Sequence, residues 1–384
     1  MPWKAKDPVD LRMEFVTRHK AGERISDLCR EFDISRKTGH KIWNRYKEVG
    51  VEGLFDASRA PRRIPHKTPS EIVDLVVQER GKHPTWGPRK LKVMLEKSSG
   101  IALPSSSTIG GILKNRGLIE PRRIRKRAAP RPTGLRATTS ANEVWCIDYK
   151  GQFRLGNGTY CYPLTLTDHC TRFILCCEGM AAISDEAARD VCLAVFAEHG
   201  LPAAIRSDNG PPFASTGLAT LTRLSVLWLR LGIELERIEP GHPEQNGRHE
   251  RMHRTLKRDT TRPAAFNLLQ QQERFDGFVE EFNASRPHEA LDMQRPADLY
   301  RPAPRRLPAR LSEPAYPLHD DVLQVERNGQ LRVGPRHLLH LSIALAGELV
   351  GIREEEDGRY LISFMNLDLG HLSPDRRAFV PICT

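Results

Sequence analysis

The feature that most limits the possible folds is the alternation of strand-like and helix-like segments between residues 143 and 290. Short apolar runs such as EVWCIDYKG and LPAAIRSDNGPPF are typical of strands. Between them lie amphipathic segments such as SDEAARDVCLAVFAEHG, which predicts a helix capped by Ser184. The order is three strands, helix, strand, helix, strand and helix. It predicts an α/β domain built on a mixed sheet.

The residues before this domain predict two helical modules. In ISDLCREFDISRKTGHKIWNRYKEV, a short helix, a turn and a second helix from Arg36 to Val49 have the helix-turn-helix layout, with Ser35 as N-cap. Gly39 inside that second helix costs about 1 kcal/mol relative to Ala. Four side chains of this helix are expected to face a major groove: Arg36, Lys37, His40 and Lys41. The alternative is a plain three-helix domain with a solvated basic face.

A second module of three helices is predicted from PSEIVDLVVQERGKH, GPRKLKVMLEKSSG and IALPSSSTIGGILKNRGLI. Two such modules in tandem extend the DNA site that the chain reads. The positive charge lies in the same part of the chain. Residues 1–140 hold 31 Lys and Arg against 15 Asp and Glu, whereas the whole chain has a net charge of +11. The sequence therefore predicts a polyanion-binding arm on a nearly neutral body.

The segment PRRIRKRAAPRPTGLR is the most basic part of this arm. It has seven Lys or Arg, three Pro and no acid, so it cannot pack a core and is expected to be extended. Five of its side chains are predicted to follow DNA phosphates: Arg122, Arg123, Arg125, Lys126 and Arg127. The alternative is a solvated linker. No basic amphipathic helix or lipidation signal supports binding to a membrane surface instead.

Several features favour a cytoplasmic protein. The start, MPWKAKDPVD, is too charged for a secretory signal, and no apolar run approaches the roughly 20 residues needed to cross a bilayer. The eight Cys form no CxxC pair and fall mostly in apolar runs, which predicts reduced thiols in a core. We therefore expect a cytoplasmic protein.

The end of the chain predicts a third kind of structure. Residues 301–314 are rich in Pro and Arg and indicate a linker, after which short strands alternate with Asn-Gly and Asp-Gly turns. We therefore predict a multidomain chain: two all-α helix-turn-helix modules, an α/β core with a mixed sheet and a small C-terminal β-barrel-like domain. The predicted boundaries are 1–60, 61–120, a basic linker 121–136, the core 137–300, a linker 301–316 and the β domain 317–384.

Three acids stand out by their positions in the core. Asp148 lies in a strand among apolar residues, Asp208 lies where a strand ends, and Glu250 begins a basic helix. A buried carboxylate is costly without a partner, so Asp148 needs a cation or a hydrogen-bond network. Three converging carboxylates would suit hard divalent ions that also bind phosphate. On the helix, Arg254 and Lys257 share the face of Glu250 and are predicted to contact DNA phosphates.

Other interpretations of these residues stay open. Glu250 near a helix N-terminus contributes roughly 0.3–1 kcal/mol through the helix dipole alone. Asp168 is expected to be a structural hydrogen-bonding acid, although it could lie near the site. The motif around Arg286 is expected to lock the end of a helix. Three histidines are candidate metal ligands without zinc-site spacing: His242, His249 and His253.

The ordered motifs WCIDYKG, RSDNGPPF, HPEQNGRHERMHRTLK and FNASRPHEALDMQRPADLY resemble the catalytic core of DDE transposases of the retroviral-integrase type, over about residues 136–300. The resemblance implies a ribonuclease-H-like fold. It implies that Asp148, Asp208 and Glu250 are the catalytic metal ligands. Glu244 is the rival for the third place, but the family pattern puts the ligand three residues after the glycine, here Gly247. The cofactor implied is a pair of Mg²⁺ ions, with Mn²⁺ able to replace them.

The resemblance also implies an activity and partners. The expected function is a bacterial insertion-sequence transposase that binds terminal inverted repeats, cleaves element ends by metal-activated hydrolysis and joins the 3′-OH to target DNA by transesterification. Double-stranded DNA, as element ends and target, and further copies of the chain in a synaptic complex are the implied partners. Two alternatives remain: a DNA-binding regulator without catalysis, and a Mg²⁺-dependent nuclease of the same fold.

Overall fold

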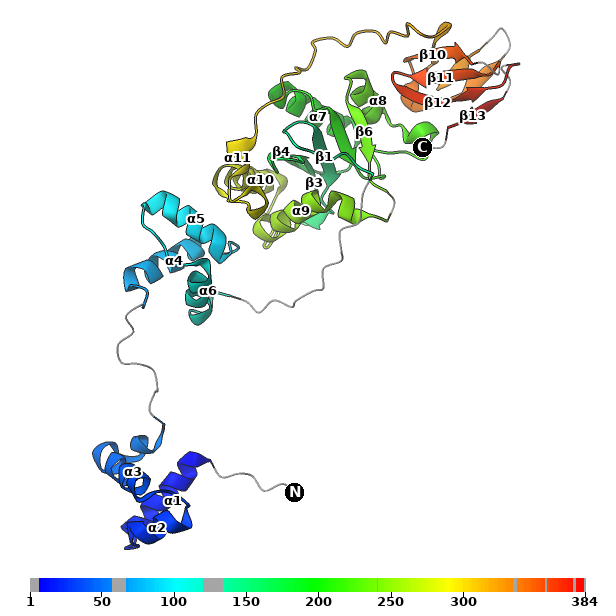
Figure 1. Ribbon diagram of the computed structural model, residues 1–384. Coiled ribbons are helices and arrows are strands. Elements are labelled where there is room, and N and C mark those ends of the chain that lie inside the picture. Colours follow the sequence, from blue (N-terminus) through cyan, green and yellow to red (C-terminus); the bar gives the residue numbers. More distant parts are fainter. Residues whose placement is uncertain are drawn as a thin grey trace. The chain divides into compact units, whose positions relative to one another are not determined.

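The structure is a computed structural model that describes residues 7–56, 67–119, 134–239, 241–333, 337–355, 358–375 and 378–382. The chain divides into two units, Met1–Pro69 and Ser70–Thr384, and each is described by itself. Helices and strands are labelled in Figure 1. In the described part of the chain, no helix combines the length and apolar character that crossing a membrane requires. The predicted contacts of Arg122, Arg123, Arg125, Lys126 and Arg127 lie outside the described residues.

The first unit has the helices predicted for a helix-turn-helix. They are α1 (Pro8–Lys20), α2 (Ile25–Glu31) and α3 (Arg36–Val49), followed by the 3₁₀ turn η1 (Gly50–Leu54). Ser35 caps α3 as predicted, because its side chain accepts a hydrogen bond from Thr38 N. The four side chains predicted to face DNA are exposed on α3: Arg36, Lys37, His40 and Lys41.

Close packing explains the glycine in the middle of α3. A Cβ atom at Gly39 would lie 2.4 Å from Cys29 Sγ and 3.0 Å from Phe15 Cζ, so only a hydrogen atom fits there. Cys29 and Phe15 belong to the buried core of the unit. The cost of glycine in a helix is therefore offset by the close approach of α3 to α1 and α2.

We predict that Gly39→Ala destabilises the first unit, although alanine favours a helix. Overpacking of this size costs about 1–3 kcal/mol, which exceeds the gain of about 1 kcal/mol in helix propensity. Hydrogen exchange of α2 and α3, measured by mass spectrometry on the full chain, should become faster. The matched control is Gly111→Ala in α6, where no atom lies within 4 Å of the added methyl group, and it should be neutral or stabilising. Unchanged exchange in Gly39→Ala would contradict the packing argument.

The second unit opens with another group of helices. These are α4 (Ser70–Lys82), α5 (Pro88–Ser99) and α6 (Ser106–Asn115). They enclose a small core that includes Val76, Trp86, Leu91 and Ile109. Ser105 caps α6 by accepting a hydrogen bond from Thr108 N. The three helices lie where the sequence predicts them.

A mixed sheet forms the centre of the second unit. Its strands are β1 (Val144–Tyr149), β2 (Phe153–Arg154), β3 (Tyr160–Asp168), β4 (Ile174–Met180), β5 (Ala204–Ser207) and β6 (Glu234–Arg237). The order is β4-β3-β1-β5-β6, with the short β2 also pairing with β3. Strand β3 is antiparallel to β1 and β4, whereas β1, β5 and β6 are parallel. This is the predicted ribonuclease-H-like arrangement of a mixed sheet.

Helices cover both faces of this sheet (Figure 1). They are α7 (Asp185–His199), α8 (Arg223–Arg230), α9 (Gly247–Thr260), α10 (Leu268–Glu280) and the short α11 (Pro296–Leu299). Short turns connect them: η2 (Leu218–Thr220), η3 (Pro243–Asn246), η4 (Glu281–Ser285) and η5 (Glu289–Leu291). Trp145 and Ile147 of β1 pack against α7 and α8, while α9 and α10 share a separate core with Cys161 and Ile174. Because side chains alternate along a strand, Cys146 and Asp148 face the α9 side.

The C-terminal residues form an open sheet, and the predicted barrel is not confirmed. The strands β7 (Asp321–Gln324), β10 (Leu349–Glu354), β11 (Tyr360–Phe364), β12 (Leu367–Leu372) and β13 (Phe379–Pro381) are antiparallel in the order β13-β12-β11-β10-β7. A separate hairpin pairs β8 (Gln330–Arg332) with β9 (Leu338–His340), and η6 (Ile343–Leu345) follows it. In the described strands the edges β13 and β7 do not pair, so the sheet does not close.

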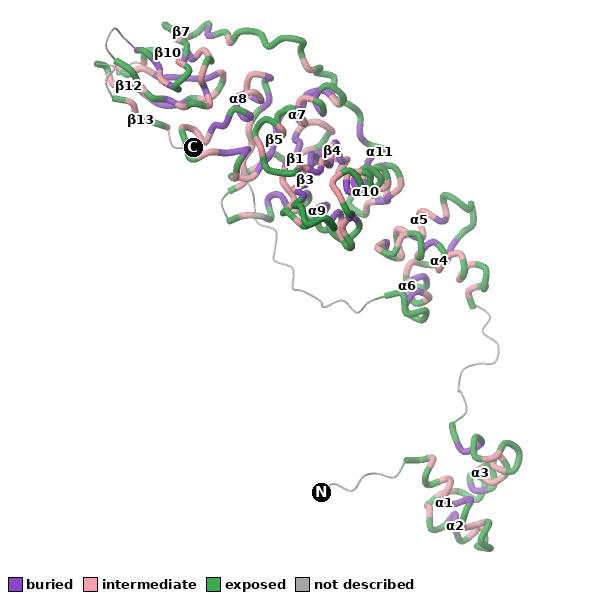
Figure 2. The backbone as a smooth tube through the Cα atoms, turned by 180° about the vertical axis from the view of Figure 1, so that it is seen from behind, coloured by how far each residue is buried: buried purple, intermediate pink, exposed green. Residues whose placement is uncertain are grey.

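The C-terminal sheet shares a core with α8. Leu221 and Val226 are buried together with residues such as Val350, Ile362 and Phe364. An ion pair between Arg230 and Glu348 adds to this contact. Figure 2 shows the buried residues concentrated in the strands and on the inner sides of the helices. Helix α8 therefore packs on the central sheet with one side and on the C-terminal sheet with the other.

Candidate metal-binding site

Strand pairing places two of the predicted acids at one edge of the central sheet. In the parallel pair β1 and β5, Cys146 lies opposite Arg206. Asp148 comes two residues after Cys146, and Asp208 comes two residues after Arg206. Asp148 is therefore the penultimate residue of β1, and Asp208 directly follows β5. The carboxyl ends of adjacent parallel strands meet at the same edge, which brings these side chains to one place.

Helix α9 contributes the third acid. Glu250 lies in its first turn and is exposed, whereas Met252 and Leu256 are buried against the sheet. The rival acid Glu244 lies in η3, and its Oε1 atom is 2.9 Å from His242 Nδ1. The charge of Glu250 raises the pKa of Asp148, although less than burial and the charge of Asp208 do.

The site strongly disfavours the ionised form of Asp148. Burial is the main cause, and the charge of Asp208 adds to it, so the pKa of Asp148 rises to about 7. Glu250 contributes in the same direction, while Lys150 opposes the shift. Such a cluster of carboxylates needs a proton or a cation to be stable.

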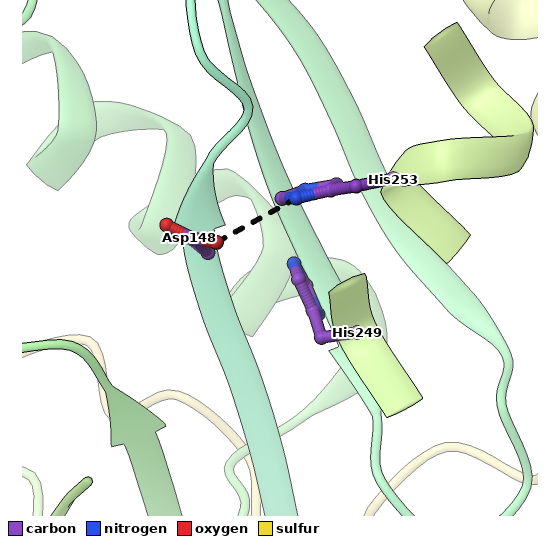
Figure 3. Close-up of side chains that lie close together, drawn as sticks. All are labelled: Asp148, His249 and His253. Carbon is purple, nitrogen blue, oxygen red and sulfur yellow. Dashed lines mark ion pairs between the residues drawn. The ribbon is translucent and has the colours of Figure 1, made fainter. Parts of the chain in front are cut away.

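A buried network of threonine and histidine contacts Asp148, and Figure 3 shows its two histidines beside the carboxylate. Thr165 Oγ1 donates to the backbone carbonyl oxygen of Asp148 at 3.1 Å. Because this hydroxyl has a single proton, it must accept hydrogen bonds from the Nε2 atoms of His249 at 2.7 Å and His253 at 2.6 Å. The lone pair of His253 Nδ1 then faces Asp148 Oδ2 at 3.5 Å. A proton on the carboxylate, or a cation beside it, would remove the repulsion between His253 Nδ1 and Asp148 Oδ2.

Asp148, His249 and His253 form a cluster whose geometry could hold a metal ion. Ligand atoms of Asp148, His249 and His253 all lie within 4.8 Å of one another. However, His249 Nδ1 also bonds to Thr167 Oγ1 at 2.7 Å, so both of its nitrogens have partners. Burial lowers the pKa of His249 to about 3, which keeps it neutral. These hydrogen bonds favour a role for the histidines in orienting Asp148 rather than in binding an ion.

Other predicted residues lie as follows. Arg254 and Lys257 are exposed on α9, on the side of Glu250. Asp168 is buried and accepts hydrogen bonds from Asn142 N, Thr171 N and Thr171 Oγ1, each at 2.7 Å. This contact set matches the expected structural acid.

One cation near the site is missing from the sequence prediction. Lys150 lies two residues after Asp148, and burial lowers its pKa, with the charge of Lys257 as the next cause. Its position directly after β1, two residues from Asp148, was the available signal in the sequence.

Comparison with known proteins agrees with this topology. Residues 138–243 and residues 231–296 each match an integrase core domain. Residues 11–62 match a helix-turn-helix domain, and residues 38–113 match a homeodomain-like domain. The chain therefore contains an integrase core domain preceded by helix-turn-helix domains. The integrase core thus covers the mixed sheet and α9, and the helix-turn-helix matches cover the helices that precede it.

Individual proteins are similar to different lengths of this chain. The transposase InsD of insertion element IS2-9 from Escherichia coli K12 is 25% identical over 312 residues, which are 78% of this chain and 95% of InsD. The Gag-Pol polyprotein of baboon endogenous virus is 27% identical over 177 residues, 46% of this chain but only 10% of the polyprotein. A solved intasome of simian T-cell lymphotropic virus, in complex with the PP2A regulatory subunit B56 gamma, has 15% identity and a TM-score of 0.39, covering 80% of this chain and 95% of that one.

Proposed function

We propose that this chain is a DNA transposase that cuts the ends of its element and joins them to target DNA. Its helix-turn-helix residues, among them Arg36, Lys37, His40 and Lys41, would bind the terminal inverted repeats. The core would hydrolyse the phosphodiester bond at each end and free a 3′-OH. That 3′-OH would attack a target phosphorus atom, forming a new phosphodiester bond while the target 3′-oxygen leaves. Two ends joined together imply several copies of the chain in one complex.

The observation that supports this proposal most is the convergence of carboxylates around Asp148. Asp148, Asp208 and Glu250 would together hold two Mg²⁺ ions, or Mn²⁺ in their place, because carboxylate oxygens suit hard cations. When bound, the ions would supply stabilisation of the developing negative charge on the reacting oxygens. The chain's own residues would bind the DNA and orient the metal ligands. Lys150, Arg254 and Lys257 would attract the DNA phosphates, while His253 and Thr165 would orient Asp148.

One assay separates the proposal from its alternatives. The full chain is incubated with an oligonucleotide carrying the element end, supercoiled plasmid and Mg²⁺. Strand-transfer product supports the transposase, and cleavage without joining supports a nuclease. Binding of the element end without either reaction supports a regulator and would reject the proposed activity.

We predict that Mg²⁺ stabilises the protein more at pH 8 than at pH 5.5. Without a cation, the pKa of Asp148 is raised to about 7, so the folded state retains a proton that the unfolded state loses near pH 4. The stability gained from this proton is present at low pH and is lost as the pH rises through 7. Bound Mg²⁺ would restore it, and metal ligation requires the ionised carboxylate that prevails at pH 8.

Thermal unfolding with Mg²⁺ and with a chelator, at both pH values, measures this effect. The Mg²⁺-dependent rise in Tm should be larger at pH 8, and Asp208→Asn should reduce it. Asp190→Asn, an exposed acid on α7, should behave as wild type. Equal Mg²⁺ effects at the two pH values would count against Asp148 as a ligand.

A further inference from the structure

A basic cavity lies on the other flank of α9, away from the acids. Its volume is about 250 Å³, and eight cationic or imidazole side chains contribute to its lining: Lys90, His169, Arg172, Arg248, His249, Arg251, Arg286 and His288. They come from α5, from the loop after β3, from α9, and from the segment after α10. The volume is below the roughly 300–1,000 Å³ typical of drug-sized ligands, so it suits a group as small as a phosphate.

The positions on α9 separate this cavity from the metal-binding site. Residues of an α-helix are spaced by about 100°, so Arg248, Arg251 and Thr255 share one flank. Glu250, Arg254 and Lys257 lie on the opposite flank. His249, Met252, His253 and Leu256 are buried between the two flanks. A ligand in the cavity would therefore not touch the carboxylates of the metal-binding site.

Two nitrogen atoms of the cavity lining are left unsatisfied in the described part of the structure. Among the described residues, the buried atoms Arg172 Nη1 and His288 Nε2 have no hydrogen-bond partner. Buried polar groups are rarely left this way, and each costs about 1–3 kcal/mol when unsatisfied. A ligand oxygen would satisfy a guanidinium N–H directly.

The positive charge of the cavity is only partly balanced. Burial lowers the pKa of Arg172 to about 10, and the charges of Arg248 and Arg251 add to this effect. Two carboxylates also line the cavity, but Asp168 already accepts three hydrogen bonds and the Glu289 side chain is 57% exposed.

Among the described residues, Arg286 is the one cavity arginine that forms ion pairs with acidic side chains. It is buried and lies 3.5 Å from Asp259 and 3.6 Å from Glu281. Arg248 donates to the carbonyl oxygen of His169 at 3.0 Å, a neutral partner that leaves its charge unbalanced. Together these contacts leave a net positive charge facing the cavity.

We propose that this cavity binds a phosphate group, supplied either by the backbone of a DNA strand that runs along this flank of α9 or by a small free polyphosphate. Arginine side chains that converge from three segments recognise phosphate oxygens through charge-assisted hydrogen bonds. The cavity shares His249 with the network around Asp148, but none of the three acids lines it, so the proposal does not rest on the proposed catalysis.

The first experiment uses inorganic tripolyphosphate as the probe and the full chain without Mg²⁺. Titration calorimetry at constant ionic strength should show saturable binding. Arg172→Gln should weaken it by roughly tenfold to a hundredfold, since a hydrogen bond to a charged group is lost. Arg251→Gln changes an exposed side chain and tests the same site where Arg172→Gln impairs folding. Arg223→Gln, an exposed arginine at the start of α8, is the matched control and should bind like wild type.

The second experiment distinguishes the two sources of phosphate. The affinity for element-end DNA is measured across salt concentrations with a chelator present, so that no DNA is cut. If DNA supplies the phosphate, Arg251→Gln should lower the slope of log K against log salt by about one relative to Arg223→Gln. If a free polyphosphate is the ligand, the slope is unchanged while tripolyphosphate binding is lost. The proposal is overturned if Arg172→Gln and Arg251→Gln change neither the binding of tripolyphosphate nor the salt dependence of DNA binding.

Discussion

Asp208→Asn is expected to abolish both DNA cleavage and strand transfer while leaving DNA binding intact. The substitution keeps the size of the side chain but removes one of the negative charges that would hold the cations. Loss of a metal ligand removes several kcal/mol of transition-state stabilisation, which corresponds to a decrease of roughly a thousandfold or more in rate. The fold should survive, because the amide oxygen can still accept the hydrogen bond that Gly210 N gives to Asp208 Oδ1 at 3.2 Å.

The measurement is a strand-transfer assay with Mg²⁺, run beside a gel-shift assay for the element end. Asp190→Asn on α7 is the control for a lost surface charge and should retain full activity. A fully active Asp208→Asn protein would remove Asp208 from the proposed ligand set. Loss of DNA binding together with activity would instead point to misfolding.

The second large effect is expected from Trp145→Ala in β1. This side chain is completely buried in the core between the sheet and α7, and its ring lies 6.0 Å from that of Phe196. Its Nε1 atom also donates to Asn142 Oδ1 at 3.0 Å. Truncation of a buried aromatic side chain costs about 3–5 kcal/mol, because the cavity left behind is only partly refilled.

Urea unfolding of the full chain, followed by circular dichroism, measures the change in the free energy of unfolding. Trp145→Phe keeps an aromatic ring beside Phe196 and loses only the N–H group and part of the volume, so its loss should be clearly smaller. A Trp145→Ala protein that loses less than about 1 kcal/mol would show that this core tolerates the cavity.

The local features of the sequence predict the core of this protein well. The strands holding Trp145 and Ile205 are short apolar runs, and the caps Ser35 and Ser184 mark the starts of helices as observed. The position of Asp148 near a strand end, and of Asp208 directly after one, follows from the same pattern. These features depend on neighbouring residues alone, which is why the sequence carries them.

Features that depend on long-range pairing were missed. Thr165 meets His249 and His253 only because the register of β3 sets it beneath α9, across more than 80 residues of sequence. Arg172 and Arg286 meet in one cavity for the same kind of reason. The barrel prediction was not confirmed because turn residues specify hairpins, whereas closure depends on the tilt and stagger of all the strands.

The two-sided packing of α8 has a practical consequence for dissecting the molecule. Trp228 belongs to the core of the central sheet, and Val226 belongs to the core of the C-terminal sheet, although both lie on the same short helix. A fragment that ends before residue 317 would expose Val226 and Leu221 to water. Such an apolar patch promotes aggregation. Crystallographic or biochemical work on an isolated catalytic fragment would therefore need to retain the C-terminal sheet, or to replace those two side chains with polar ones.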